Sequence, residues 1–161
     1  MFVAYTDLPD HSRVWVYQSN REFTENEVAQ ICEKSKVFIE NWTRHGEALK
    51  ASFIVKYNHF LVLSVDESFK NVSGCSIDAS VHFIKELEAE FNVDLTNKMN
   101  VSFKDGDHIN IVKLSDFQQY IKEQKISGNT IVFNNMINNK NEFETQWEVT
   151  AKESWHKRFL L

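Results

Sequence analysis

The stretch FTENEVAQICEKSKVFIENWTRHG, residues 23–46, carries the strongest local signal in the chain and predicts an amphipathic helix. Thr24 and Glu27 have the spacing of a capping box, in which the hydroxyl accepts from the N3 amide and the carboxylate accepts from the cap amide. Over residues 28–42 the apolar side chains recur at helical spacing, so one face of the helix is expected to be buried. Gly46 is expected to end the helix in a left-handed conformation.

Three strands and a second helix are expected around this first helix. Bulky β-forming residues alternate with polar ones in RVWVYQS (13–19), which is typical of a strand. The segment ASFIVKYNHFLVLSV (51–65) predicts two strands joined by a tight turn at Asn58 and His59, with His59 facing solvent. Apolar residues at helical spacing predict the second helix over residues 77–91.

The C-terminal part of the chain predicts a hairpin, a strand and two short helices. Asp105 and Gly106 suit a tight turn between the alternating strands of MNVSFKDGDHINIVKL (99–114). Ser115 and Gln118 have the spacing of another capping box. The elements after the hairpin are expected in this order: a short helix from Ser115, a strand at TIVFNN (130–135), turns at NNMINNKNE (134–142), and a final short helix capped by Thr150 and Glu153.

This order of elements predicts an α+β fold. The first six elements, β-α-β-β-α-β, match the ferredoxin-like arrangement, in which both helices cover one face of an antiparallel sheet. The C-terminal hairpin, strand and helices would extend that sheet. The chain has 161 residues, 42% of them hydrophobic, and no linker or internal repeat divides it, so we expect a single α+β domain over residues 1–161.

Composition and motifs exclude several classes of protein. The net charge is −5 and no run of Lys and Arg is longer than two, which disfavours nucleic acid as a partner. None of the four glycines begins a Gly-Lys-Ser/Thr motif and no GxGxxG is present, so the chain is not a P-loop ATPase. Two cysteines without a CxxC motif or a Cys/His cluster predict neither a disulfide framework nor a zinc site, and no cofactor is expected.

The chain is expected to be cytoplasmic, with no membrane partner. Its first residues, MFVAYTDLPDHSR, carry aspartates where a signal peptide would carry lysine and a long apolar run. No apolar stretch approaches the ~20 residues that a membrane-spanning helix needs.

One segment, SGCSIDAS (73–80), has the composition of a possible catalytic site. Cys75 stands at the expected start of the second helix, where unpaired amides and the helix dipole would stabilise a thiolate. Ser73, Gly74 and Ser76 would leave backbone donors free to bind an anion. In the alternative interpretation, which we favour, Ser76 or Asp78 caps the helix, Gly74 makes the turn and Cys75 fills a small space.

A catalytic cysteine also needs a base. His82 lies two helical turns beyond Cys75, about 10 Å along the axis, which is too far for a hydrogen bond. His59 and His108 lie in expected hairpin turns and are the candidate partners, although the sequence places neither tip next to Cys75.

The C-terminal tail, WEVTAKESWHKRFLL (147–161), is rich in aromatic residues. Trp147, Trp155 and Phe159 predict either a contact surface for a partner, since such side chains are typical interface anchors, or a tail that docks on its own domain. Both interpretations stay open at the level of sequence.

Five segments carry a resemblance to known proteins: RVWVYQSNREFT (13–24), HGEALKASF (45–53), SGCSIDASVHFIKELE (73–88), TIVFNN (130–135) and AKESWHKRF (151–159). Together they resemble a family of small, uncharacterised bacterial proteins, some of which carry the label "ABC transporter ATPase". The resemblance extends over most of the chain and brings no established substrate or active site, so no functional residue follows from it. The label does not imply ATP hydrolysis here, because the ATP-binding motifs are missing.

These observations lead to three hypotheses. The first is a cytoplasmic, non-enzymatic protein that acts through self-association or a protein partner. The second is a thiol-dependent enzyme or thiol sensor centred on Cys75. The third is a small-molecule binding module with Trp or Phe walls.

Overall fold

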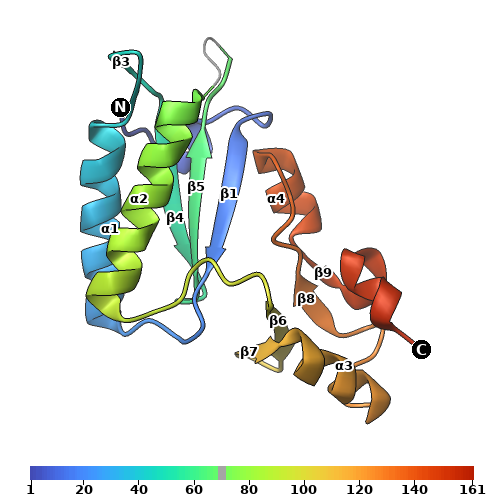
Figure 1. The fold of residues 1–161 in the computed structure, drawn as a ribbon. Coiled ribbons are helices and arrows are strands. Elements are labelled where there is room, and N and C mark those ends of the chain that lie inside the picture. The colour runs from blue at the N-terminus through green and yellow to red at the C-terminus, as the bar shows by residue number, and fades with distance from the viewer. Residues whose placement is uncertain (69–71) are drawn as a thin grey trace.

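The computed structural model describes residues 1–68 and 72–161 and has an α+β fold with two main antiparallel sheets (Figure 1). Its elements are, in chain order, the 3-10 helix η1 (Tyr5–Asp7), β1 (Arg13–Gln18), α1 (Glu25–Glu40), β2 (Thr43–Arg44), β3 (Glu47–Ala48), β4 (Ala51–Lys56), β5 (Phe60–Val65), α2 (Gly74–Phe91), β6 (Asn100–Asp105), β7 (His108–Lys113), α3 (Leu114–Lys122), β8 (Ile131–Phe133), α4 (Lys140–Gln146), β9 (Glu148–Thr150), and the 3-10 helices η2 (Ala151–Glu153) and η3 (Trp155–Phe159).

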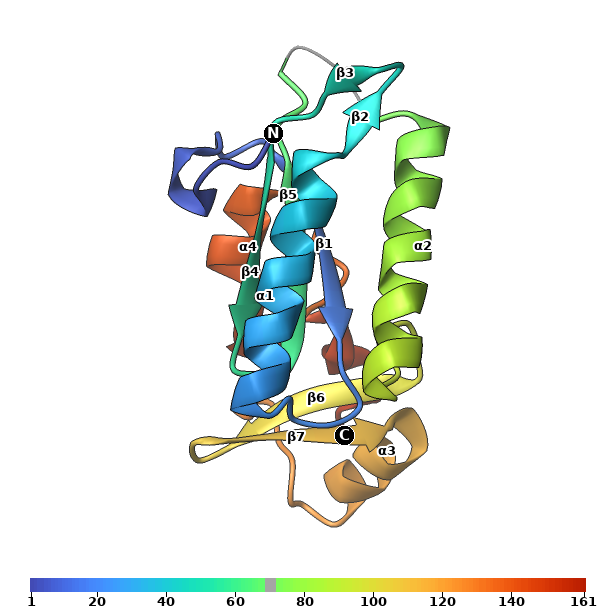
Figure 2. The same ribbon diagram turned by 90° about the vertical axis from the view of Figure 1, so that its left-hand side faces the viewer.

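The first sheet has the strand order β1-β5-β4, with β5 in the centre and every residue of β5 buried. Helices α1 and α2 cover one face of this sheet, and α4 lies on the other face (Figures 1 and 2). The alternation of side chains along β5 divides its residues between two cores. Leu61 and Leu63 face the helices α1 and α2, whereas Phe60 and Val62 join the cluster that contains residues of α4. A third cluster of buried residues lies around the second sheet. The single domain expected over residues 1–161 stays a prediction.

The capping box that predicts α1 is confirmed. The Thr24 hydroxyl accepts from the Glu27 amide (3.1 Å), and the Glu27 carboxylate accepts from the Thr24 amide (2.9 Å). The Arg21 guanidinium donates to both carboxylate oxygens of Glu27 (2.8 and 2.7 Å) and to the carbonyl oxygen of Phe91 (2.7 Å), which joins the start of α1 to the end of α2. The bonds from Arg21 and Thr24 lower the pKa of Glu27 to about 2.

The expected end of α1 at Gly46 is wrong, because the helix ends at Glu40. The amides of Asn41 and Trp42 bond to carbonyls only three residues back, which tightens the last turn and brings the chain out of the helix. Gly46 (φ +81°) instead forms, with His45 (φ +50°), the turn between β2 and β3. Two consecutive residues with positive φ are typical of a type I′ hairpin turn.

The ferredoxin-like topology is not confirmed. The order β1-β5-β4 and the two covering helices fit this topology. The strand that would be the fourth of the ferredoxin-like motif is β6, and it lies in a second sheet with the order β7-β6-β8-β9. Asn92 ends α2 in a left-handed conformation (φ +51°), and the chain then runs across the end of the first sheet (Figure 2). Part of the β1 edge, where β6 would pair, is occupied by a later segment, since the Val14 amide bonds to the carbonyl of Asn138 (3.0 Å).

Two predicted turns differ in detail. In the β4–β5 hairpin the residues with positive φ are Tyr57 and Asn58, one position earlier than expected. His59 is therefore not a solvent-facing turn residue: it is buried, and its Nδ1 lies 2.8 Å from the carbonyl oxygen of Tyr57. In the β6–β7 hairpin the partners Asp105 and His108 enclose a two-residue loop that begins with Gly106 (φ +62°).

The helix boundaries of the C-terminal part also differ from those predicted. Helix α3 begins at Leu114, and within residues 1–68 and 72–161 no side chain caps it, so the capping box expected at Ser115 and Gln118 is wrong. The asparagine-rich segment expected to form turns contains the start of α4. Asn139 caps this helix, because its Oδ1 accepts from the amide of Glu142 (2.8 Å).

Lys140, in the first turn of α4, is 6% exposed. Its ammonium donates to the carbonyl oxygens of Tyr5 (3.1 Å) and Leu8 (2.8 Å), and it lies 4.8 Å from the centre of the Tyr5 ring. A single buried cation therefore holds the N-terminal segment against α4.

Replacing Lys140 by methionine is expected to lower the free energy of unfolding by about 2 kcal/mol, because two buried carbonyl groups lose a charged donor while the packing of the stem is kept. Urea unfolding followed by circular dichroism measures the change. Lys122→Met, at an exposed lysine of α3, is the matched control and is expected to stay within about 0.5 kcal/mol of the original protein. Equal losses in the two variants would contradict the structural role of Lys140.

Candidate functional site

The start of α2 lies three residues before the predicted one. Ser73 is the cap, and its hydroxyl accepts from the Ser76 amide (3.2 Å). Cys75 is therefore the second residue of the helix, and its side chain is exposed. The interpretation in which Cys75 fills a small buried space is wrong, and so is the cap expected at Ser76 or Asp78, because Ser73 caps the helix.

The hydroxyl groups near Cys75 are used within the protein. Ser76 is buried and its hydroxyl donates to the carbonyl oxygen of Thr43 (2.7 Å), next to the hydroxyl of Ser73 (2.8 Å). The indole Nε1–H of Trp42 donates to the carbonyl oxygen of Ser76 (2.9 Å). These bonds join the first turn of α2 to the segment that leaves α1. The anion site expected at Ser73, Gly74 and Ser76 stays a prediction, with the Ser76 amide already bonded.

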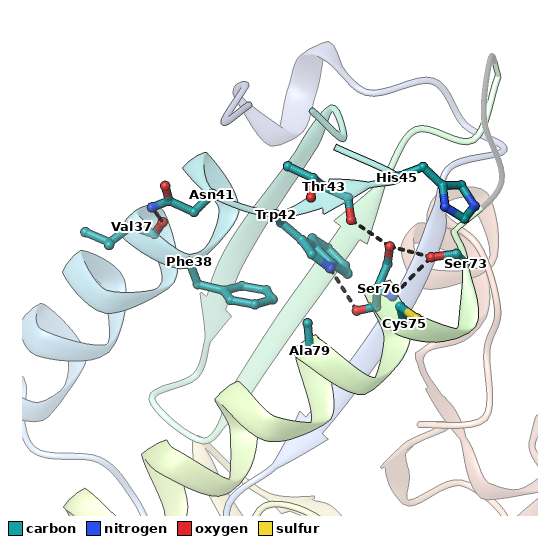
Figure 3. A pocket seen from close by; sticks show the side chains of 10 residues that line it. All are labelled: Val37, Phe38, Asn41, Trp42, Thr43, His45, Ser73, Cys75, Ser76 and Ala79. Carbon is teal, nitrogen blue, oxygen red and sulfur yellow. Dashed lines mark hydrogen bonds between the residues drawn. The ribbon is translucent and has the colours of Figure 1, made fainter. Parts of the chain in front are cut away.

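Cys75 lies in a pocket of about 350 Å³ between the end of α1, the β2–β3 hairpin and the start of α2 (Figure 3). Phe38 and Trp42 form apolar walls, with their ring centres 5.1 Å apart. The volume is at the lower end of the range for small-molecule sites.

The histidine in this pocket is His45, not one of the two predicted partners of Cys75. His45 lines the pocket from the β2–β3 turn, and Ser73 lines it from the start of α2 (Figure 3). His59 lies just before the first residue of β5, whereas α2 begins near the other end of that strand (Figure 2). The length of a six-residue strand, about 20 Å, therefore separates His59 from Cys75. His108 lies in the hairpin of the second sheet. No local signal pointed to His45, because its position depends on where the chain turns after α1.

A second and larger hollow is a groove of about 740 Å³ between α1 and α2. The rings of Phe38 and Phe83 stack across it with centres 4.5 Å apart, and Val37 beside them is 59% exposed. A salt bridge between Lys34 and Glu90 (3.0 Å) crosses from one helix to the other. The groove adjoins the Cys75 pocket, since the two hollows share three lining residues: Val37, Phe38 and Ala79.

The predicted contact surface in the C-terminal tail is wrong for one residue. Trp147 is buried: its ring stacks on Phe143 (4.7 Å), and its Nε1–H donates to Asn135 (2.9 Å). Trp155 and Phe159 are half-buried and pack on the core around the second sheet, which fits a tail docked on its own fold. A partner role for these two residues stays a prediction.

Comparisons with protein-family models, with curated proteins and with solved structures found no match to this chain. The resemblance to a family of small bacterial proteins therefore stays a prediction. Among the helices of residues 1–68 and 72–161, none has the length and apolar character that a membrane span requires. The same residues contain no group of three or more His, Cys, Asp or Glu side chains placed to hold a metal ion.

Proposed function

We propose that this chain is a cytoplasmic, non-enzymatic protein that acts through contact with another protein, and that the groove between α1 and α2 is its binding surface. One observation carries the proposal: the groove has a floor of aromatic and aliphatic side chains that reaches solvent at Val37. Contiguous exposed apolar surface with a polar rim is typical of interaction sites. The rim here consists of charged residues of both helices, among them Glu33, Lys34 and Glu86.

A photo-crosslinking amino acid at position 37 tests this proposal in the cells that produce the protein. The matched control places the same group at position 136, since Met136 is a second exposed apolar residue (72% exposed) far from the groove in sequence. A protein adduct at position 37 and none at position 136 is the expected result. Equal labelling at both positions, or none at position 37, would refute the groove as the binding surface.

Thiol chemistry at Cys75 is the second candidate. The observation that favours it is an exposed cysteine in the first turn of a helix with His45 lining the same pocket. The other cysteine, Cys32, is half-buried, and its burial raises the pKa of its thiol.

The pH dependence of alkylation in a Cys32→Ser background tests the thiol candidate. Activation of Cys75 requires a midpoint well below the ordinary thiol pKa of about 8.5, and a shift of that midpoint when His45 is replaced by glutamine. An ordinary midpoint that does not respond to His45→Gln would reject it.

A further inference from the structure

The excess negative charge of the chain is concentrated in the two helices that form the groove. Helix α1 carries four acidic and two basic residues, and α2 carries four acidic and one basic. Their combined charge of −5 equals the net charge of the entire chain, so the remaining residues are balanced. These two helices therefore account for the excess negative charge of the chain.

The acidic character extends to the rim of the groove itself. Glu33, Glu86 and Glu90 line it, and the only opposing formal positive charge among the described lining residues is Lys34, which is paired with Glu90. The Nε2 of His82 lies 3.0 Å from the Oε1 of Glu86 on the same helix. A second copy of this chain, docked face to face, would bring the same acidic rim against this one, and like charges across an interface oppose association.

The combined length of the groove and the adjoining Cys75 pocket suits a helix. Cys75 lines the far end of the pocket and Glu90 the far end of the groove, about 22 Å apart along α2 at the rise of an α-helix. That length accommodates about four helical turns. Two neighbouring helices with apolar residues between them form a trough that receives the apolar stripe of a third helix.

We infer that the groove binds an amphipathic helix of a different protein, about four turns long, with Lys or Arg on both sides of its apolar stripe. The apolar stripe contacts Phe38, Phe83 and Val37, and the basic residues face Glu33 and Glu86. This inference rests on the proposed function, since it names the partner class of the same groove.

Three synthetic peptides of about 15 residues test the inference by fluorescence anisotropy with the purified chain. The first has leucines at i, i+3, i+4 and i+7 with lysines elsewhere, the second has glutamates in place of the lysines, and the third is a scrambled leucine–lysine sequence. The first peptide is expected to bind at least about tenfold more tightly than either of the others, and its binding is expected to weaken as salt is added.

The variant Val37→Glu separates binding in the groove from general attraction between opposite charges. It adds a negative charge, so general attraction for the lysine peptide would increase, but it also places a carboxylate on the apolar wall of the groove. Groove binding is expected to weaken by about tenfold, whereas the matched variant Met136→Glu adds the same charge elsewhere and is expected to bind as the original protein does.

Other results overturn the inference in distinguishable ways. Equal binding of the ordered and scrambled lysine peptides, or unchanged binding by Val37→Glu, would refute the basic helix as the occupant. A crosslinked adduct of two copies of this chain at position 37 would identify the occupant as a second copy, which refutes this inference and leaves the contact surface intact. The absence of any adduct at position 37 refutes the proposed function itself.

Discussion

Replacing Trp42 by alanine is expected to lower the free energy of unfolding by about 4 kcal/mol, because it removes a large buried ring from the junction of α1, α2 and the first sheet. The ring packs against Phe38 and Trp15, with centre-to-centre distances of 5.1 and 6.1 Å. These neighbours belong to different elements, which limits how far they can move into the space that the ring leaves. The loss therefore includes a cavity term in addition to the lost burial of the ring.

The variant Trp42→Phe removes the hydrogen bond and keeps most of the packing. It keeps an aromatic ring but leaves the carbonyl oxygen of Ser76 without the indole donor, which is expected to cost about 1 kcal/mol. Urea unfolding followed by far-ultraviolet circular dichroism compares the variants without depending on tryptophan fluorescence. If Trp42→Ala lost no more stability than Trp42→Phe, the ring would not be the packing element that joins the two helices.

The parts of the fold that were predictable from sequence are those specified by local chemistry. The capping box at Thr24 and Glu27 places α1, and the alternation of side chains places β1, because both signals involve neighbours in the chain. Helix α4 was not predicted, because it is short and begins in an asparagine-rich stretch. Its buried residue Lys140 belongs to a residue type that is almost always exposed.

Most of the features that were not predicted depend on contacts between residues far apart in the chain. The strand β6 would have completed a ferredoxin-like sheet, but it pairs with β8, about 30 residues later, through Phe103 and Val132. The candidate site shows the same division. The position of Cys75 near a helix start follows from local signals. The presence of His45 in the same pocket depends instead on the β2–β3 hairpin, which has strands of two residues and reverses the chain after α1.

The imidazole of His156, near the C-terminus, is fully buried. It lies between the rings of Trp155 and Phe117, at 3.8 and 5.4 Å between centres. Its Nδ1 lies 2.8 Å from the hydroxyl of Ser154, and its Nε2 has no hydrogen-bond partner among residues 1–68 and 72–161. Burial, aided by the positive charge of Arg158, lowers the pKa of His156 from 6.5 to about 4.

This buried ring is expected to make the protein less stable in acid. Between pH 6.5 and about 4 the unfolded chain binds a proton at His156 that the folded chain does not, so the free energy of unfolding decreases as the pH falls through this range. The full loss amounts to about 3 kcal/mol. Glu27 acts in a separate window: its lowered pKa means that its contribution is lost only as the pH falls from 4.5 towards about 2.

Urea unfolding at pH 7 and at pH 5 measures the effect of His156 before most carboxylates titrate. The variant His156→Phe keeps a ring in the core but removes the titrating group, so it is expected to lose about 2 kcal/mol less than the original protein between these two pH values. His82→Gln removes an exposed histidine of α2 and is expected to keep the original pH dependence. If His156→Phe and His82→Gln lost stability equally between pH 7 and pH 5, the acid sensitivity would arise from groups other than His156. A smaller loss in His156→Phe alone would assign the acid sensitivity to the buried ring, because only this variant removes a histidine that folding withdraws from water.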